Sequence, residues 1–266
     1  MSAPQNASPR QRSGWIKPLI GLFVGSLLIV AAGSAALWWM YTTPSGLRFV
    51  VLLNSRLNTS VVIDDVSGSL RDGFAAGTLS VKGPTWSLQA TDIAVEPFDL
   101  RWRQRFFDFE RVGARTATLD WVPSGEPAKP PQSLATPIDL RVRNLNIGEL
   151  RFGERGAAQR VVNNIVADFR LNEDAVLIER GALQYGPSQV ALTARVDARS
   201  PFALRADAQI TSTLLDHSVA AKVRASGTLL DAFVEIEADS SDARAQITAR
   251  LTPFAAVPLA QLNADV

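Results

Sequence analysis

From Val61 onward, apolar and polar residues alternate along the chain, and this period of two constrains the fold more than any other feature. Alternation places one set of side chains on each face of a β-strand. Turn residues such as Gly, Pro and Asp interrupt it at short intervals, and no helical periodicity appears after Asn58. The sequence therefore predicts a mainly β protein, built of many short strands that each have one apolar and one polar face.

The alternation in the second half of the chain predicts which residues share the apolar face. Charged residues such as Arg195, Glu235 and Arg250 stand between them and would lie on the opposite, wet face. The residues expected to line the apolar face are Val190, Leu192, Val196, Phe202, Leu204, Ile210, Val219, Val223, Val234, Ile236, Ile247 and Leu251.

A sheet with one apolar face either buries that face or keeps it open for a partner. In the first architecture the sheet folds into a sandwich or closed barrel whose inner faces fill each other. In the second it curls into an elongated, taco-like groove with an open lining. Periodicity alone leaves both architectures open. The lining is dominated by Ala and Val, whereas a sandwich core about 10 Å thick normally needs more large side chains, so composition favours the groove.

The N-terminal region predicts a membrane anchor. No charged residue occurs between Lys17 and Arg48, and about 20 apolar residues suffice to cross a hydrocarbon core of about 30 Å. Residues 1–17 would form a cytosolic tail and 18–41 a retained signal anchor, with the rest of the chain exported, because positive residues favour the cytosolic side. The alternative is a cleaved signal peptide, but the apolar run is longer than the usual h-region. The expected interfacial contacts are Lys17, Trp38, Trp39 and Tyr41.

Residues 42–58 are expected to form a juxtamembrane amphipathic helix with Ser45 as its N-cap. Its apolar face, which includes Phe49, Val50 and Leu53, should pack on the sheet that follows.

The β region divides into a first section at 59–122 and a second section at 138–266. The Pro-rich segment 123–137 between them cannot join a sheet and is expected to be a loop. The alternation changes parity near Asn144, which predicts a bulge or turn. In the first section, Arg101, Arg103 and Arg105 would share one polar strand face, either solvated or in contact with anionic lipid.

Composition and motifs exclude several classes of function. The chain has no Cys, so it has neither disulfides nor thiolate metal sites. The net charge is +1 and basic residues do not gather on one segment, so we expect no nucleic-acid partner. The one histidine, His217, lies in an expected turn without a positioned partner. We therefore expect no catalytic residues, no metal site and no cofactor.

Several short motifs behind the anchor match a known pattern. In chain order they are the Ser-Gly pair Ser45 and Gly46 before a short apolar helix, Gly-Ser-Leu at Gly68 to Leu70, Gly73, and a strand ladder that carries Trp102. In this order, over about Trp15 to Pro123, the chain resembles the TamB family. That family is the inner-membrane subunit of the translocation and assembly module and is AsmA-like.

The resemblance implies a long β groove that crosses the periplasm of Gram-negative bacteria and carries phospholipid from the inner to the outer membrane. It implies a single-pass inner-membrane protein with a cytoplasmic N-terminus that also supports outer-membrane protein assembly and protein secretion. The implied partner is the Omp85-type outer-membrane barrel TamA, which family members meet through a C-terminal part. Those members are much longer, so we expect this chain to be an N-terminal fragment whose second β section continues beyond residue 266.

A second function remains open at this stage. The protein could be an adaptor or chaperone scaffold that inserts outer-membrane proteins by templating a client strand on an exposed sheet edge, without conducting lipid. An Ala/Val lining suits acyl chains, which need no hydrogen bonds. An edge template depends instead on backbone groups, about which the sequence says nothing.

Overall fold

A computed structural model describes residues 34, 36, 38–57, 60–123, 131–214, 217–240, 244–252, 254 and 259–265. Lys17 and most of the expected anchor at 18–41 lie outside these residues. Among the residues that are described, no helix is long and apolar enough to cross a bilayer.

Within this described part, strands dominate and belong to a single sheet. The strands of the first section are β1 (Val61–Asp64), β2 (Ser67–Ser69), β3 (Gly73–Lys82), β4 (Trp86–Val95), β5 (Phe98–Arg101), β6 (Phe106–Phe109) and β7 (Val112–Trp121). Those of the second are β8 (Asp139–Glu154), β9 (Arg160–Leu171), β10 (Ala175–Tyr185), β11 (Ser188–Asp197), β12 (Ala203–Leu214), β13 (His217–Thr228), β14 (Ala232–Asp239), β15 (Arg244–Thr252) and β16 (Leu259–Asp265).

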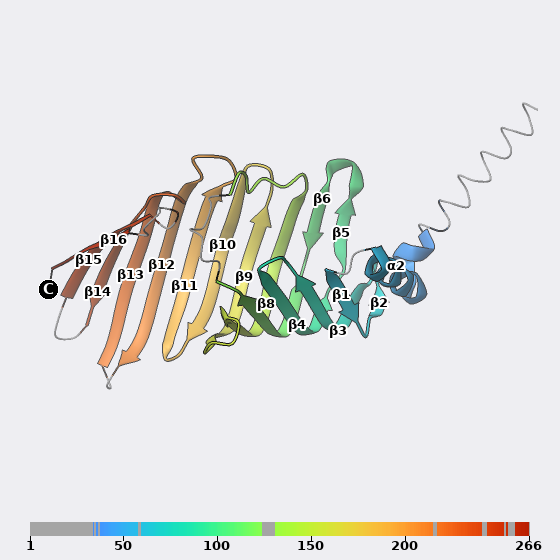
Figure 1. Cartoon of the computed structure of the whole chain (residues 1–266), viewed down its shortest axis with the longest axis horizontal. Helices are drawn as coiled ribbons and strands as arrows, with labels where there is room; N and C mark the ends of the chain where they lie inside the picture. The colour runs from blue at the N-terminus through green and yellow to red at the C-terminus, as the bar shows by residue number, and fades with distance from the viewer. Residues whose placement is uncertain are drawn as a thin grey trace, which may run out of the picture.

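The strands follow one another across the sheet almost in chain order, as Figure 1 shows. From β8 to β16 each strand pairs antiparallel with the next, so this half is a meander of hairpins. The order β1-β3-β4-β7 precedes it, while β2 pairs with β3, and the β5–β6 hairpin branches from β8. The sequential, mainly antiparallel array that the short turns predicted is confirmed.

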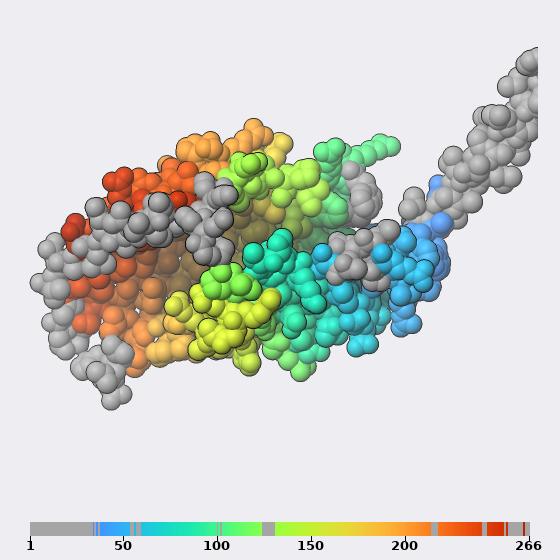
Figure 2. Space-filling model, viewed as in Figure 1, coloured from blue at the N-terminus to red at the C-terminus, as the bar shows by residue number. Residues whose placement is uncertain are grey.

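The sheet is open and curled rather than closed. Each described strand makes its extended contacts with the strands it pairs with, and no second sheet faces β11. A sandwich or a closed barrel is therefore wrong for the part of the chain that the structure describes. In the space-filling view of Figure 2, one side of the curled sheet is hollowed between two rims.

The two β sections join through a parallel pairing. β7 runs parallel to β8, with Val112 opposite Leu145 and Trp121 opposite Glu154. The chain must therefore return along the strand direction between the end of β7 and the start of β8. Part of this connection is fastened to a residue far along the chain, because the Leu134 N–H donates to the Ala198 carbonyl at 2.8 Å. The Pro-rich segment is thus a crossover within one sheet.

Bulges interrupt the pairing at the middle of the sheet. On β8 the register shifts between Val142 and Leu145, which confirms the irregularity expected near Asn144. On β10 a second shift lies between Ile178 and Gly181. An extra residue in one strand bends it and increases its twist. These bulges favour the curl while keeping the apolar residues on one face.

The helix α2 (Pro44–Leu57) lies within the expected range of 42–58. Thr43 caps it: its Oγ1 accepts a hydrogen bond from the Gly46 N–H at 3.0 Å. Pro44 then occupies the first helical position, where its missing N–H costs nothing. The prediction of Ser45 as the N-cap is wrong, because the residue before Pro44 already supplies the capping oxygen.

The helix packs on the sheet through a different face from the one predicted. Leu47 is 3% exposed and joins Val66 and Ala76 in a small core, with Val51 packed against it. Phe49 and Leu53, which we expected on the packing face, are 44% and 45% exposed. Both sides of the helix are apolar, so periodicity could not decide which side the sheet would cover.

A second correction concerns the arginines at 101 to 105. The chain does not continue as a strand there, because Trp102–Gln104 forms a 3-10 turn between β5 and β6. Arg105 follows with a positive φ of 51°. The three arginines therefore do not share one strand face, and Trp102 belongs to the turn rather than to the strand ladder.

Candidate functional site

The candidate site is the apolar face of the sheet, and the strand register shows how its residues assemble. Residues paired directly across antiparallel strands share a face. Val223 pairs with Ile236, and Ile236 pairs with Ile247. The same reasoning places on one face all the residues that the sequence predicted for the lining, with the exception of Phe202.

Phe202 lies elsewhere because β12 begins at the next residue. It occupies the turn after β11, where its N–H donates to the Arg199 carbonyl, and it has a positive φ of 58°. Its side chain is only 2% exposed. Phe202 therefore belongs to the packed end of the sheet and offers no open surface.

The apolar face extends much further than the predicted lining. One line of paired residues, which we call the first apolar row, crosses eleven strands without a polar side chain. In order, from β3 to β15, it is Phe74, Val95, Val112, Leu145, Ala167, Gly181, Leu192, Ala208, Val223, Ile236 and Ile247. Ten spacings of about 4.8 Å give this row a length of about 50 Å.

A second apolar row runs beside the first on the same face, from β5 to β15. Its members are Phe98, Phe109, Val142, Phe169, Ile178, Ala194, Ala206, Ala225, Val234 and Ala249. Large side chains occupy its first half, where the rings of Phe98 and Phe109 stack at 4.7 Å between centroids. From β11 onward it consists of Ala and Val. The second row therefore changes from large to small side chains along the sheet.

Exposure identifies this face as the inner side of the curl. Ala206, whose cross-strand neighbours are Ala194 and Ala225, is half-buried. Ala191 lies on the other face beside the longer Gln209 and is exposed. Side chains converge on a concave face and diverge on a convex one. Ala206 is less exposed than Ala191 although its neighbours are smaller, so the face that carries Ala206 is the concave one. The exposures therefore place the apolar rows on the more enclosed face of the sheet.

The outer face has the opposite character. Across β11 to β15, the row adjacent to Val223 and Ile236 reads Thr193, Asp207, Arg224, Glu235 and Thr248. The exposed Arg224 lies 3.6 Å from Glu237 and 4.0 Å from Asp207. Such exposed pairs contribute little stability, at most about 1 kcal/mol each. Their main effect is to keep this face in water and the apolar face on the inside.

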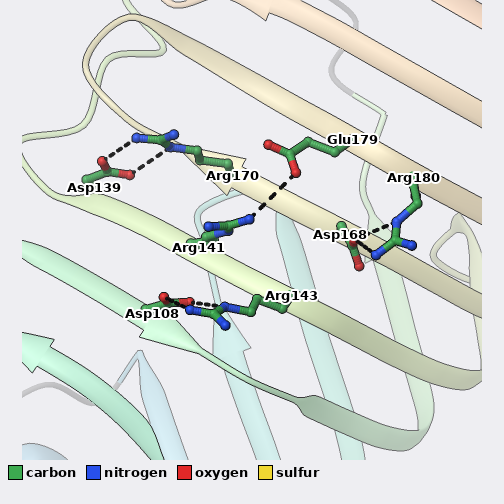
Figure 3. A network of polar contacts seen from close by, with 8 residues as sticks. All are labelled: Asp108, Asp139, Arg141, Arg143, Asp168, Arg170, Glu179 and Arg180. Atoms are coloured by element: carbon green, nitrogen blue, oxygen red, sulfur yellow. Dashed lines mark hydrogen bonds and ion pairs between the residues drawn. The ribbon is translucent and has the colours of Figure 1, made fainter.

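Ion pairs also brace the region where the two sections join (Figure 3). Arg143 of β8 holds Asp108 of β6 through two hydrogen bonds, across a parallel strand pair. These hydrogen bonds and the charge of Asp108 raise the pKa of the Arg143 guanidinium. Asp108 is only 8% exposed, so loss of its partner would leave a carboxylate poorly solvated.

The same network continues across β9 and β10 in Figure 3. Arg170 donates to both carboxylate oxygens of Asp139, at 3.3 and 2.8 Å, and this hydrogen bonding raises the pKa of Arg170. Arg180 donates through two of its nitrogens to a single carboxylate oxygen, Oδ2, of Asp168. These contacts tie together the strands that carry the bulges. We interpret the network as structural, because each acid in it is matched by an arginine.

The aromatic residues of the expected anchor lie at the end of the sheet that carries α2. Trp38 and Trp39 are 63% and 40% exposed. Tyr41 is half-buried, and its carbonyl accepts a hydrogen bond from the Arg71 N–H at 3.1 Å. Trp39 and Phe49 of α2 lie 6.0 Å apart between ring centroids.

The described residues show no arrangement suited to metal chemistry, since no three of their His, Asp and Glu side chains lie close enough to hold an ion. The His217 side chain lies outside the description, and its backbone pairs with Leu214 at the turn between β12 and β13. Comparison with protein-family models, with curated proteins and with solved structures found no match for the chain.

The lining predicted from the sequence began at Val190, so it left out the first half of both apolar rows, which includes Phe74, Val112 and Phe169. A signal was present at Phe169, which alternates with the polar neighbours Asp168 and Arg170. Alternation gives the face of each residue within its own strand. It does not give the pairing across the parallel junction or through the bulges, which is what makes the two halves one continuous surface.

Proposed function

We propose that this protein is a TamB-like, periplasm-spanning groove protein that carries phospholipid from the inner towards the outer membrane. The observation that carries the proposal is the first apolar row, which is uninterrupted across eleven strands on the inner face of an open sheet. An acyl chain needs no hydrogen bonds, and this row offers none from its side chains. The open side of the groove would leave the charged head group of the lipid in water.

The dimensions support transfer along the sheet rather than binding at one position. Half of a hydrocarbon core of about 30 Å corresponds to one acyl chain, or about 15 Å. The first apolar row, at about 50 Å, is roughly three times as long. A lipid lying across the strands would therefore occupy only part of the row. We infer that it moves by steps along an almost featureless apolar surface.

In this proposal the N-terminal segment anchors the chain in the inner membrane and the sheet lies in the periplasm. Lipid delivery would support outer-membrane protein assembly together with the barrel TamA. The protein is not an enzyme in this view, since movement along the row makes and breaks no covalent bond.

Site-specific photo-crosslinking in cells tests the proposal. A diazirine amino acid placed at position 223 or 236 points into the apolar face, whereas one at position 226 lies on the exposed outer face of the same strand β13. We expect phospholipid to be recovered by mass spectrometry from positions 223 and 236 and not from position 226. Recovery of protein adducts alone from the two inner positions would refute lipid carriage.

One observation favours the adaptor function as a second candidate. Among the described strands, β5 pairs with β6 alone, so its other edge is available to a client strand. A short edge strand can recruit a peptide through backbone hydrogen bonds. A diazirine at position 99 on β5 would then capture an outer-membrane protein precursor. If position 99 captures such a client while positions 223 and 236 capture no lipid, the adaptor function replaces the lipid carrier.

A further inference from the structure

The helix α2 has two apolar faces, and only one of them is covered by the sheet. Leu47 and Val51 pack on the core formed with Val66 and Ala76. Phe49 and Leu53 each follow one of these residues by two positions, which is about 200° around the helix. Their side chains point away from the sheet and are 44% and 45% exposed.

The exposed face is continuous with further apolar surface. Leu52, on the same face, is 60% exposed. Trp39 lies beside Phe49, with 6.0 Å between the ring centroids. A Cβ added at Gly46 would meet the Trp39 carbonyl oxygen, so the helical turn at 38–42 lies directly against α2. Contiguous apolar side chains of this kind mark a contact surface rather than scattered exposure.

We propose that this face of α2 lies in the membrane interface, with Phe49, Leu52 and Leu53 directed into the acyl region. The proposal rests on the membrane anchoring within the proposed function. The occupant is lipid because Trp39 lies within the run between Lys17 and Arg48, which has no charged residue. No acidic residue precedes Asp64 in the sequence, so α2 and the helical turn before it carry no negative side chain that would oppose anionic head groups.

Other features fit an interfacial helix. Trp side chains favour the level of the head groups, and Trp38 and Trp39 are both exposed here. Arg56 in the last turn is exposed and falls on the same side as Phe49 and Leu53 at the helical period, where a cation can reach phosphate groups. Arg48 instead donates to the Val66 carbonyl at 3.3 Å and ties the helix to the sheet.

The consequence concerns where the groove begins. Phe74, the first member of the first apolar row, packs against the core beneath α2. Figure 1 places α2 at this end of the sheet, beside β1 and β2. A helix seated in the interface would therefore hold the start of the row at the membrane surface. Lipid could then leave the bilayer beside α2 without crossing water over a long distance.

Depth-dependent fluorescence quenching tests the inference on the full chain. The protein has no Cys, so single-cysteine variants can be labelled without background. Leu53→Cys reports on the exposed face of α2, and Ala191→Cys reports on the exposed outer face of β11. Each variant carries an environment-sensitive dye and is reconstituted in vesicles of phosphatidylethanolamine and phosphatidylglycerol containing spin-labelled lipid. We expect strong quenching and a blue-shifted emission at position 53 and neither at position 191.

A second variant shows whether the apolar face itself is responsible. Adding Phe49→Ser to Leu53→Cys should reduce quenching at position 53 to the level at position 191, while Leu47 keeps the helix on the sheet. Equal quenching at positions 53 and 191 would overturn the inference, as would a dye at position 53 that is shielded from water but not quenched by lipid. Crosslinking at position 223 tests lipid carriage, and quenching at position 53 tests the contact of α2 with the membrane. Each result can therefore refute one proposal without deciding the other.

Discussion

Val223 of β13 lies directly opposite Ile236 of β14 on the inner face of the sheet. The adjacent pair along the same two strands, Arg224 and Glu235, lies on the outer face. One step along the chain thus moves a side chain from an apolar surface to a charged one. The two surfaces can therefore be tested by matched substitutions a few residues apart.

A charge on the inner face should stop lipid movement without unfolding the sheet. In Val223→Asp, the carboxylate remains in contact with water while the groove is empty, so stability should change little. Passage of an acyl chain would desolvate it, at a cost on the order of several kcal/mol. We expect lipid crosslinking at positions on β14 and β15 to be lost in cells that produce the variant at normal levels. The matched control is Ser226→Asp, on the outer face of the same strand.

The control should retain crosslinking and outer-membrane integrity. If Val223→Asp is as abundant and as active as Ser226→Asp in cells that lack redundant paralogues, the inner face is not the lipid path.

A bulky apolar residue tests the shape of the groove without changing its polarity. Ala206 lies in the part of the second apolar row that has only small side chains, between Ala194 and Ala225. Ala206→Phe should fill this part and reduce lipid crosslinking at position 236. Ala191→Phe, on the outer face, should leave crosslinking unchanged. Both sites have room for a larger side chain, so thermal stability should change by less than about 1 kcal/mol in each variant. Equal crosslinking in the two variants would contradict a path along the second row.

The sequence was most informative where strands pair as simple hairpins. From β11 to β15 the register runs without a shift, so parity alone placed residues such as Leu192, Val223 and Ile247 on one face. The prediction that Phe202 lines the apolar face is wrong, because alternation cannot show where a turn ends and a strand begins. At this boundary, a residue with positive φ closes the turn and its side chain is buried.

Other features depend on tertiary structure and could not be predicted. A Pro-rich segment is equally compatible with a spacer between two sheets and with a crossover inside one sheet. The parallel pairing of β7 with β8 decides between them. The packing face of α2 was also undetermined, because Leu47 and Phe49 are both apolar and lie on opposite sides. The openness of the sheet follows from the absence of a facing layer among the described elements, which composition favoured but could not establish.

The parallel junction should be sensitive to one methyl group. A Cβ added at Gly148 of β8 would lie 2.7 Å from the Arg115 carbonyl oxygen of β7, and a backbone atom cannot easily move away. Gly148→Ala should therefore destabilise the fold by roughly 1–3 kcal/mol. The matched control is Gly113→Ala on β7, whose added Cβ would have no neighbour closer than 3.8 Å. It should be neutral or slightly stabilising, by up to about 1 kcal/mol.

Urea unfolding of both variants measures the difference. A loss of stability in Gly113→Ala as large as that in Gly148→Ala would show that the junction responds to backbone freedom rather than to the close approach of the two strands.

The last prediction concerns pH and the pair formed by Asp231 and Arg250. Arg250 donates to both carboxylate oxygens of Asp231, at 2.8 and 2.7 Å, which joins the start of β14 to β15. These hydrogen bonds hold the pKa of Asp231 below its ordinary value of 3.8. A depressed carboxyl pKa contributes stability above the pKa of the unfolded chain, and that contribution is lost as the pH falls through the lower folded value. Asp231→Asn should therefore lower the unfolding temperature at neutral pH, by a small amount because both side chains are largely exposed.

The difference between Asp231→Asn and the unmodified protein should shrink as the pH falls below 3.8 and should also shrink in high salt, since exposed charges are screened. Asn keeps the size of Asp, and the hydrogen bonds between residues 231 and 228 use only the backbone N–H and carbonyl of residue 231, so they should survive in the variant. Unfolding temperatures measured at neutral and acid pH, in low and high salt, test this expectation. A difference that stays the same at every pH would mean that Asp231 acts through the turn alone, and that its charge does not help hold β14 to β15.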